Sequence, residues 1–258
     1  MSRLGRLVRR VPRLPSDRDW ERSAVLEPRV VTRHPELISD GGGLPFEPAA
    51  LAGSPGLLDP DDPAVGVLIA QLSGPTEGQR GFRAPWTRDT ARPAAPPSLD
   101  GWRELARADD EVLFARGQPP QLLTVAVGKD RRRPTWSLIG TSRSRPLRAT
   151  RDGIRASSWR LDPAHELDPN RTVLRVLLTE QTFSGAQRAD GRVLAPDLYL
   201  TADELVLTMF VTPRPGFQAR SPNPETAVRV ALPEPVAARR LIDGALYDTA
   251  LRDARPGQ

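Results

Sequence analysis

Residues 171–180 read RTVLRVLLTE, a near-continuous apolar run without the spacing of a helix face. Its apolar members are Val173, Leu174, Val176, Leu177 and Leu178. Strands buried on both faces have such runs, because neither face of the sheet meets water. The run therefore predicts a central strand, around which the rest of the fold is organised.

Further short apolar stretches, separated by turn residues, predict strands before and after this one. They cover residues 122–127, 135–139, 157–161, 197–200, 204–211 and 226–232. Alternation places Trp136 and Leu138 on one face of their strand, and Trp159 and Leu161 on one face of theirs. Strands of this length and spacing are typical of sandwiches and barrels. We expect a mainly β protein with a C-terminal antiparallel β-sandwich.

The N-terminal half is rich in loops and partly helical. We expect a basic, disordered tail over residues 1–45, then a loop-rich region over residues 46–98 with a short helix at 64–72 and a proline-rich linker from residue 74. The sandwich domain is predicted over residues 99–248, entered by a short helix that Asp100 starts and then a strand before residue 115. We expect residues 249–258 to be a disordered C-terminus.

Composition excludes several kinds of site. The 258 residues include 28 prolines and 20 glycines but no cysteine, which excludes disulfides, thiolate metal sites and a cysteine nucleophile. The two histidines, His34 and His165, are too far apart in sequence to indicate a metal site. No apolar segment approaches the roughly 20 residues that span a bilayer, so we expect a soluble chain.

The net charge of +5 comes almost entirely from arginine, since Lys129 is the only lysine. This arginine bias fits a GC-rich genome as well as it fits anion binding. One cluster, Arg131, Arg132 and Arg133, lies between two predicted strands, and Arg143 and Arg145 follow in the next loop. If both loops lie at one end of the sandwich, they form a basic rim for phosphates or acidic partners. The alternative is a pair of solvated loops.

The first sixteen residues have the pattern of a basic amphipathic helix. One arc carries Leu4, Leu7 and Val8, and the adjoining arc carries Arg3, Arg6, Arg9 and Arg10. This pattern indicates reversible docking on an anionic membrane or an acidic partner, with a plain disordered tail as the alternative. No apolar region of a signal peptide follows, so we expect a cytoplasmic protein, or one peripheral on the inner face of the membrane.

About half of the chain, residues 120–245, resembles a group of uncharacterised proteins of high-GC Gram-positive bacteria. The resemblance is carried by Trp136, ASSWRL at 156–161, VLLTE at 176–180, Ser184-Gly185, GRV at 191–193, Pro196, Asn223-Pro224, VALPEP at 230–235 and LIDG at 241–244. The similar proteins are usually exported and have cysteines near the positions of Thr182 and Arg220, which implies a disulfide bond between the two loops. This chain lacks both cysteines, which fits a reducing compartment. The resemblance implies no activity.

No motif in the sequence indicates catalysis. Asp109, Asp110 and Glu111 are adjacent and would point to different faces, as in a solvated turn. Glu180 ends a buried strand, and we expect it to pair with Arg192 or Arg239 rather than to act as a catalytic acid. Ser184 lacks the flanking glycine of a nucleophile elbow.

We therefore predict a non-enzymatic binding or assembly module without cofactor, catalytic residues or metal ligands. A protein is the expected partner. One alternative is an enzyme acting on carbohydrate or cell-wall material through unrecognised carboxylates. The other is a binder of anionic membrane surfaces or nucleic acid that works through its arginines.

Overall fold

The computed structural model describes residues 15–53, 58–73, 97–130 and 133–247. The chain divides into two compact units: the sandwich unit, Met1–His34 with Arg151–Gln258, and the central unit, Pro35–Thr150. The predicted domain start at residue 99 is therefore wrong, because the structure divides the predicted sandwich domain between residues 150 and 151. Residues 17–34, predicted as part of the tail, contribute a helix and two strands to the sandwich unit.

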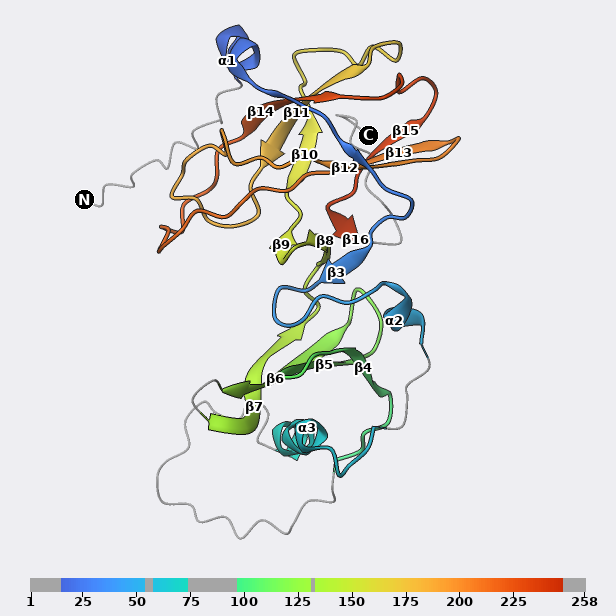
Figure 1. Cartoon of the computed structure of the whole chain (residues 1–258), viewed down its shortest axis with the longest axis vertical. Coiled ribbons are helices and arrows are strands. Elements are labelled where there is room, and N and C mark those ends of the chain that lie inside the picture. Colours follow the sequence, from blue (N-terminus) through green and yellow to red (C-terminus); the bar gives the residue numbers. More distant parts are fainter. Residues whose placement is uncertain (1–14, 54–57, 74–96, 131–132, 248–258) are drawn as a thin grey trace, which may run out of the picture. The chain divides into compact units, whose positions relative to one another are not determined.

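The first sheet of the sandwich unit contains the predicted central strand (Figure 1). Its order is β1 (Val25–Leu26), β14 (Thr226–Ala231), β11 (Val173–Thr179) and β10 (Ser158–Leu161). The strand β11 pairs with β14 on one side and with β10 on the other, both antiparallel. The prediction of a central strand in residues 171–180 is thus confirmed.

The second sheet of this unit has the order β15 (Arg240–Asp243), β13 (Glu204–Thr208), β12 (Asp197–Leu200) and β2 (Arg29–Val30). One apolar core joins the two sheets, since it takes Leu174, Val176 and Leu178 from β11 and Leu205 and Leu207 from β13. Trp159 and Leu161 belong to the same core, as the predicted alternation requires. Two sheets that share one core form a β-sandwich.

The sandwich is mixed rather than purely antiparallel. The strand β1 runs parallel to β14, β2 runs parallel to β12, and β15 runs parallel to β13. The first two pairs arise because residues 25–30 of the N-terminal segment add a two-residue strand to the edge of each sheet. Strands this short have no periodicity that a sequence pattern could reveal. Two further short strands of the unit are β9 (Ile154–Arg155) and β16 (Leu246–Tyr247).

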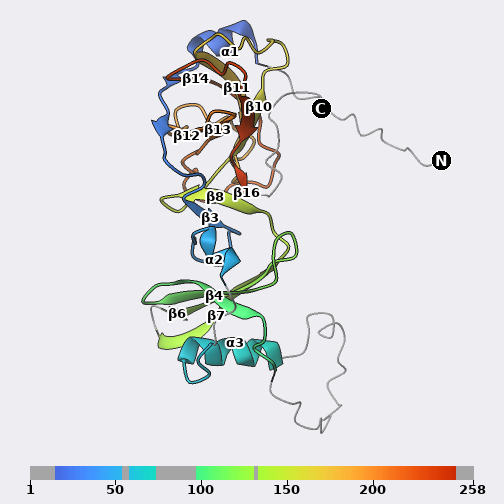
Figure 2. The ribbon, with the colours of Figure 1, turned by 90° about the vertical axis from the view of Figure 1, so that its right-hand side faces the viewer.

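The helix α1 (Asp17–Arg22) covers part of the outer face of the first sheet, beside β14 and β11 in Figure 2. Its residue Trp20 is buried and forms a small apolar cluster with Leu177 of β11 and Ala227 of β14. At Leu177 both faces of β11 are therefore covered, one by the sandwich core and the other by α1. This explains why the sequence of β11 shows no alternation between apolar and polar residues.

The central unit is an antiparallel meander with a helix on one face. The strands follow chain order: β4 (Trp102–Arg107), β5 (Glu111–Arg116), β6 (Leu123–Asp130) and β7 (Arg133–Arg143). The helix α3 (Pro63–Ser73), predicted at 64–72, buries Ala64, Val65 and Leu68 against this sheet. A short helix, α2 (Ala49–Ala52), and a pair of strands, β3 (Leu37–Ser39) with β8 (Leu147–Arg151), complete the unit.

Two details of the central unit differ from the prediction. Residues 102–107, expected to be helical after Asp100, form the strand β4, because Gly101 has a φ of 77° and turns the chain instead of continuing a helix. In β7 the side chain of Leu138 is 41 % exposed, whereas Trp136 packs against the core near α3. The register shifts directly after Leu138, because Val127 pairs with Leu138 and Ala126 with Gly140, so Leu138 adjoins an irregular point of the strand.

Candidate functional site

The predicted anion-binding arginines whose backbone the structure describes lie at the two ends of one strand. Arg133 and Arg143 are the first and last residues of β7, which has 11 residues. A straight strand of this length spans about 33 Å, because a strand rises about 3.3 Å per residue. Arg145 is exposed just beyond the second end, and Arg131 and Arg132 lie outside the described residues. Anion binding by these arginines stays a prediction from the sequence.

The predicted N-terminal docking segment is not part of the described structure. Residues 1–14 lie outside the described ranges. With them lie the proposed docking residues Arg3, Leu4, Arg6, Leu7, Val8, Arg9 and Arg10. That docking hypothesis stays a prediction from the sequence.

The predicted ion pair of Glu180 is confirmed, and its partner is Arg192. Arg192 donates from Nη1 and Nη2 to the two carboxylate oxygens of buried Glu180 over 2.8 and 2.5 Å. This forked bond raises the pKa of the Arg192 guanidinium above its ordinary value. The alternative partner, Arg239, pairs with Glu234 instead. Both oxygens of Glu180 are thus engaged in holding the fold.

Two other arginines stand opposite each other on the outer face of the first sheet. Arg175 of β11 is in register with Arg229 of β14. Because Leu174 and Val176 face the sandwich core, alternation turns Arg175 to the opposite side of the sheet. Residues directly opposite on neighbouring strands lie about 5 Å apart, where two like charges destabilise a sheet. This part of the fold therefore concentrates positive charge.

Neither arginine of the pair forms an ion pair with a carboxylate in the described part of the chain. Arg175 donates to His165 Nε2 over 2.6 Å, and its guanidinium lies 5.5 Å from the centre of the Trp20 ring. Arg229 donates from Nε to the main-chain oxygen and the Oγ of Ser23, over 3.2 and 3.1 Å. All of these partners are uncharged acceptors or an aromatic ring. Among the residues that the structure describes, neither guanidinium is therefore bonded directly to a carboxylate.

The partners of His165 fix its tautomer. The carboxylate of buried Asp162 lies 2.6 Å from Nδ1, and Arg175 lies at Nε2 on the other side of the ring. A guanidinium can only donate, so Nε2 accepts and Nδ1 carries the proton that is donated to Asp162. Since both ring nitrogens are occupied, His165 has no nitrogen free to act as a general acid or base.

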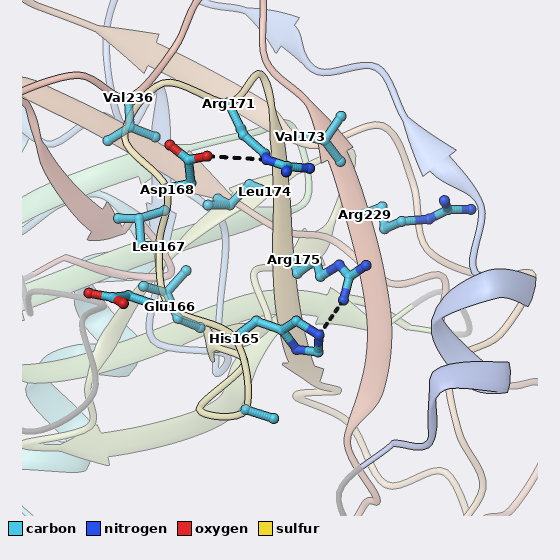
Figure 3. A pocket seen from close by; sticks show the side chains of 12 residues that line it. His165, Glu166, Leu167, Asp168, Arg171, Val173, Leu174, Arg175, Arg229 and Val236 are labelled. Atoms are coloured by element: carbon cyan, nitrogen blue, oxygen red, sulfur yellow. Dashed lines mark hydrogen bonds and ion pairs between the residues drawn. The ribbon is translucent and has the colours of Figure 1, made fainter.

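Arg175, Arg229 and His165 border a cavity of about 700 Å³ (Figure 3). Part of its wall is apolar, made by Leu161, Leu167, Val173, Leu174 and Val236. Its border also carries the acids Glu166 and Asp168, and Asp168 pairs with Arg171 over 3.2 Å. A second cavity of about 310 Å³ is lined by the same arginines and histidine and by Asp17, Trp20 and Glu21 of α1. Cavities of this size are typical of small-molecule sites.

The buried carboxylates of the described residues all have polar partners. They are Asp40, Asp162, Glu180 and Asp197. Asp197 pairs with Arg29 and Arg151, and Asp40 accepts a bond from Thr124. Asp162 and Glu180 lie at opposite ends of the β10 and β11 pair, so they cannot flank one bond of a substrate. No group of three histidine, aspartate or glutamate side chains within the described ranges could hold a metal ion.

Sequence reasoning missed Arg175 and Arg229. The available signal was a single arginine within an apolar run in each strand, in VLRVLLT at 173–179 and in TAVRVA at 226–231. A charge at such a position has to reach a site or a partner. The register that places the two arginines opposite each other cannot be predicted from the sequence, because about 50 residues of chain separate their strands.

No protein-family model, curated protein or solved structure matches this chain. None of the helices in the described ranges is long and apolar enough to cross a membrane. The function has therefore to be argued from the site itself.

Proposed function

We propose that this protein is a non-enzymatic binding module in which Arg175 and Arg229 bind an anionic group of the ligand. The observation that carries the proposal is the cross-strand arginine pair beside a cavity, without a carboxylate partner in the described chain. Guanidinium groups bind carboxylates and phosphates through charge-assisted hydrogen bonds. An anion between the two arginines would replace their repulsion by attraction.

The lining of the larger cavity supports a ligand with an apolar body. Leucine and valine side chains make part of its wall, next to the arginines. Glu166 and Asp168 on the same border would repel a second negative charge. A single carboxylate or phosphate attached to an apolar body, as in an acidic segment of a protein partner, fits better than a polyanion such as nucleic acid.

The state of the titratable groups supports binding rather than catalysis. His165 is engaged at both nitrogens, and the buried carboxylates of the described chain are bonded to other side chains. A carbohydrate-acting enzyme needs one carboxyl group that releases a proton and another that accepts one or attacks, on either side of the scissile bond. The cavity border offers instead three arginines, Arg171, Arg175 and Arg229, and acids that are exposed to solvent.

Isothermal titration calorimetry with the full chain tests the proposal, with hexanoate, hexyl phosphate and uncharged hexanol as probes. We expect the two anions to bind and hexanol to bind much more weakly. Arg175→Gln and Arg229→Gln should each raise Kd at least about tenfold, since one charge-assisted hydrogen bond contributes roughly 1.5–3 kcal/mol. Arg240→Gln is the matched control, because Arg240 is an exposed arginine paired with Glu204 on the second sheet. An unchanged Kd in Arg229→Gln, or equal binding of hexanol, would contradict the proposal.

A further inference from the structure

Two phenylalanines are exposed at the opposite end of β11 from Arg175. Phe217 is 96 % exposed, the highest value among the large apolar side chains of the described residues, and Phe183 is 52 % exposed. Phe183 belongs to the loop of residues 180–193, which follows β11, and Phe217 to the loop of residues 212–225, which precedes β14. Exposed aromatic side chains that come together mark interaction surfaces more often than isolated ones.

The two loops, called here the paired loops, are bound firmly to each other. Asn223 accepts hydrogen bonds from the main-chain N and the Oγ of Ser184 over 3.0 and 2.8 Å, and donates to the main-chain oxygen of Glu180 over 2.9 Å. Arg192, already paired with Glu180, also donates to the main-chain oxygen of Thr212 over 2.7 Å. These bonds connect the bases of both loops. Their phenylalanines are therefore presented on an ordered support.

The turn that carries Phe217 directs this side chain outward. Gly216 adopts a φ of 76°, a conformation that glycine tolerates best. The side-chain nitrogen of Gln218 donates to the main-chain oxygen of Pro215 over 2.9 Å and closes the turn. Phe217 lies between these two residues, and its side chain is turned to solvent.

Arginines flank the exposed phenylalanine on both sides. Arg214 and Arg220 lie three residues before and three residues after Phe217. Neither forms an ion pair with a carboxylate of the described chain, in contrast to Arg188 of the other loop, which pairs with Asp19 and Asp190. Arg220 is exposed and Arg214 is half-buried. An exposed aromatic ring with cations close to it in the sequence is complementary to a surface that is anionic outside and apolar beneath.

We propose that the paired loops dock on an anionic bilayer surface, with Phe217 inserted at the boundary between headgroups and acyl chains and Arg214 and Arg220 on the lipid phosphates. A fluid bilayer admits a convex tip without a preformed pocket, whereas a protein partner would need a cavity shaped for it. Phe183, 52 % exposed on the other of the paired loops, offers further apolar area. Arg175 lies five residues before Glu180, about 17 Å along an extended strand, so docking leaves the proposed anion site accessible.

Sedimentation of the full chain with vesicles of phosphatidylglycerol and phosphatidylcholine tests this proposal. We expect binding to mixed vesicles, and little binding to pure phosphatidylcholine. Phe217→Ser should lower the partition coefficient at least about tenfold, and Arg214→Gln and Arg220→Gln about fivefold each. Ile139→Ser, which removes a 55 % exposed apolar side chain from β7 of the central unit, is the matched control and should change nothing.

A second measurement reports insertion directly. Phe217→Trp places a fluorophore at the tip, and brominated lipids should quench the added fluorescence when vesicles are present. Ile139→Trp, in the central unit, should show no such quenching. Equal vesicle binding by wild type and Phe217→Ser would overturn the proposal and move the binding to another segment, such as residues 1–14. Absence of quenching in Phe217→Trp on bound vesicles would overturn it as well.

Discussion

Trp20 covers Leu177 on the outer face of the first sheet, and a double-mutant cycle measures that contact. Both side chains are buried, and they form with Ala227 a cluster that is separate from the sandwich core. Truncating a buried leucine costs about 2–5 kcal/mol of unfolding free energy, and truncating a buried tryptophan about 3–5 kcal/mol. We expect Leu177→Ala and Trp20→Ala to fall within these ranges.

The two costs should not add. Once Trp20 is truncated, the side chain of Leu177 is partly exposed to water. Leu177→Ala then removes less buried apolar area than it does in the wild type, and its cost is smaller. The double variant should therefore be more stable than the sum of the single costs predicts, by about 1–3 kcal/mol, as expected for residues in contact. Urea unfolding followed by circular dichroism provides the four free energies of unfolding that the cycle requires.

Leu174→Ala is the matched control for this cycle. Leu174 lies on the same strand but belongs to the sandwich core, on the other face of the sheet. Its cost should add to that of Trp20→Ala within about 0.5 kcal/mol, as for residues without shared contacts. Additive costs for Trp20→Ala and Leu177→Ala would refute the placement of α1 over β11.

Three other predictions concern stability. Burial lowers the pKa of His34 to about 4, so the neutral imidazole is favoured in the folded chain. The free energy of unfolding should therefore fall by about 3 kcal/mol between pH 6.5 and pH 4, and urea titrations of His34→Asn should lack this part of the pH dependence. Glu180→Gln leaves the Arg192 guanidinium partly buried without its counter-charge, and should lower the free energy of unfolding by about 3–5 kcal/mol. Adding Arg192→Met to that variant should restore part of this free energy, because it removes the unpaired charge. Gly244→Ala would place a methyl group 2.7 Å from His34 Nε2 and should lower Tm, whereas Gly140→Ala, which meets nothing within 4 Å, should lower it less.

The strands of the sandwich were predictable where the sequence pattern is local. Residues 197–200 form β12 with the predicted bounds, and residues 204–208 begin β13 where expected. Each stretch is long enough to carry an apolar pattern and is bounded by residues that favour turns. The same holds for α3, which begins one residue before and ends one residue after the predicted helix.

Features that depend on distant segments were not predictable. The two-residue strands β1 and β2 gain their hydrogen bonds from β14 and β12, far along the chain, and have no pattern of their own. For the same reason residues 17–34 were assigned to a tail, although Trp20 is buried on the sandwich. The candidate site depends in the same way on the register of β11 with β14. Sequence periodicity shows which face a residue occupies but not which residue stands opposite it.

The repulsion between Arg175 and Arg229 leads to a last prediction, on the response of the fold to anions. An anion that binds only the folded chain raises the free energy of unfolding by RT ln(1 + [L]/Kd). If sulfate binds between the two guanidinium groups with a Kd of about 1 mM, 20 mM sulfate should add about 1.8 kcal/mol. Sodium chloride at the same ionic strength screens the two charges but does not bridge them, so it should add less.

The arginine variants decide whether this stabilisation arises at the proposed site. Sulfate also stabilises proteins in general, because it is excluded from their surfaces, and that effect should be the same in every variant. We therefore expect urea unfolding to show a larger sulfate increment in the wild type and in Arg240→Gln than in Arg229→Gln. An undiminished increment in Arg229→Gln would mean that sulfate acts through surface exclusion or at another place, and the arginine pair would then lose its role as an anion site.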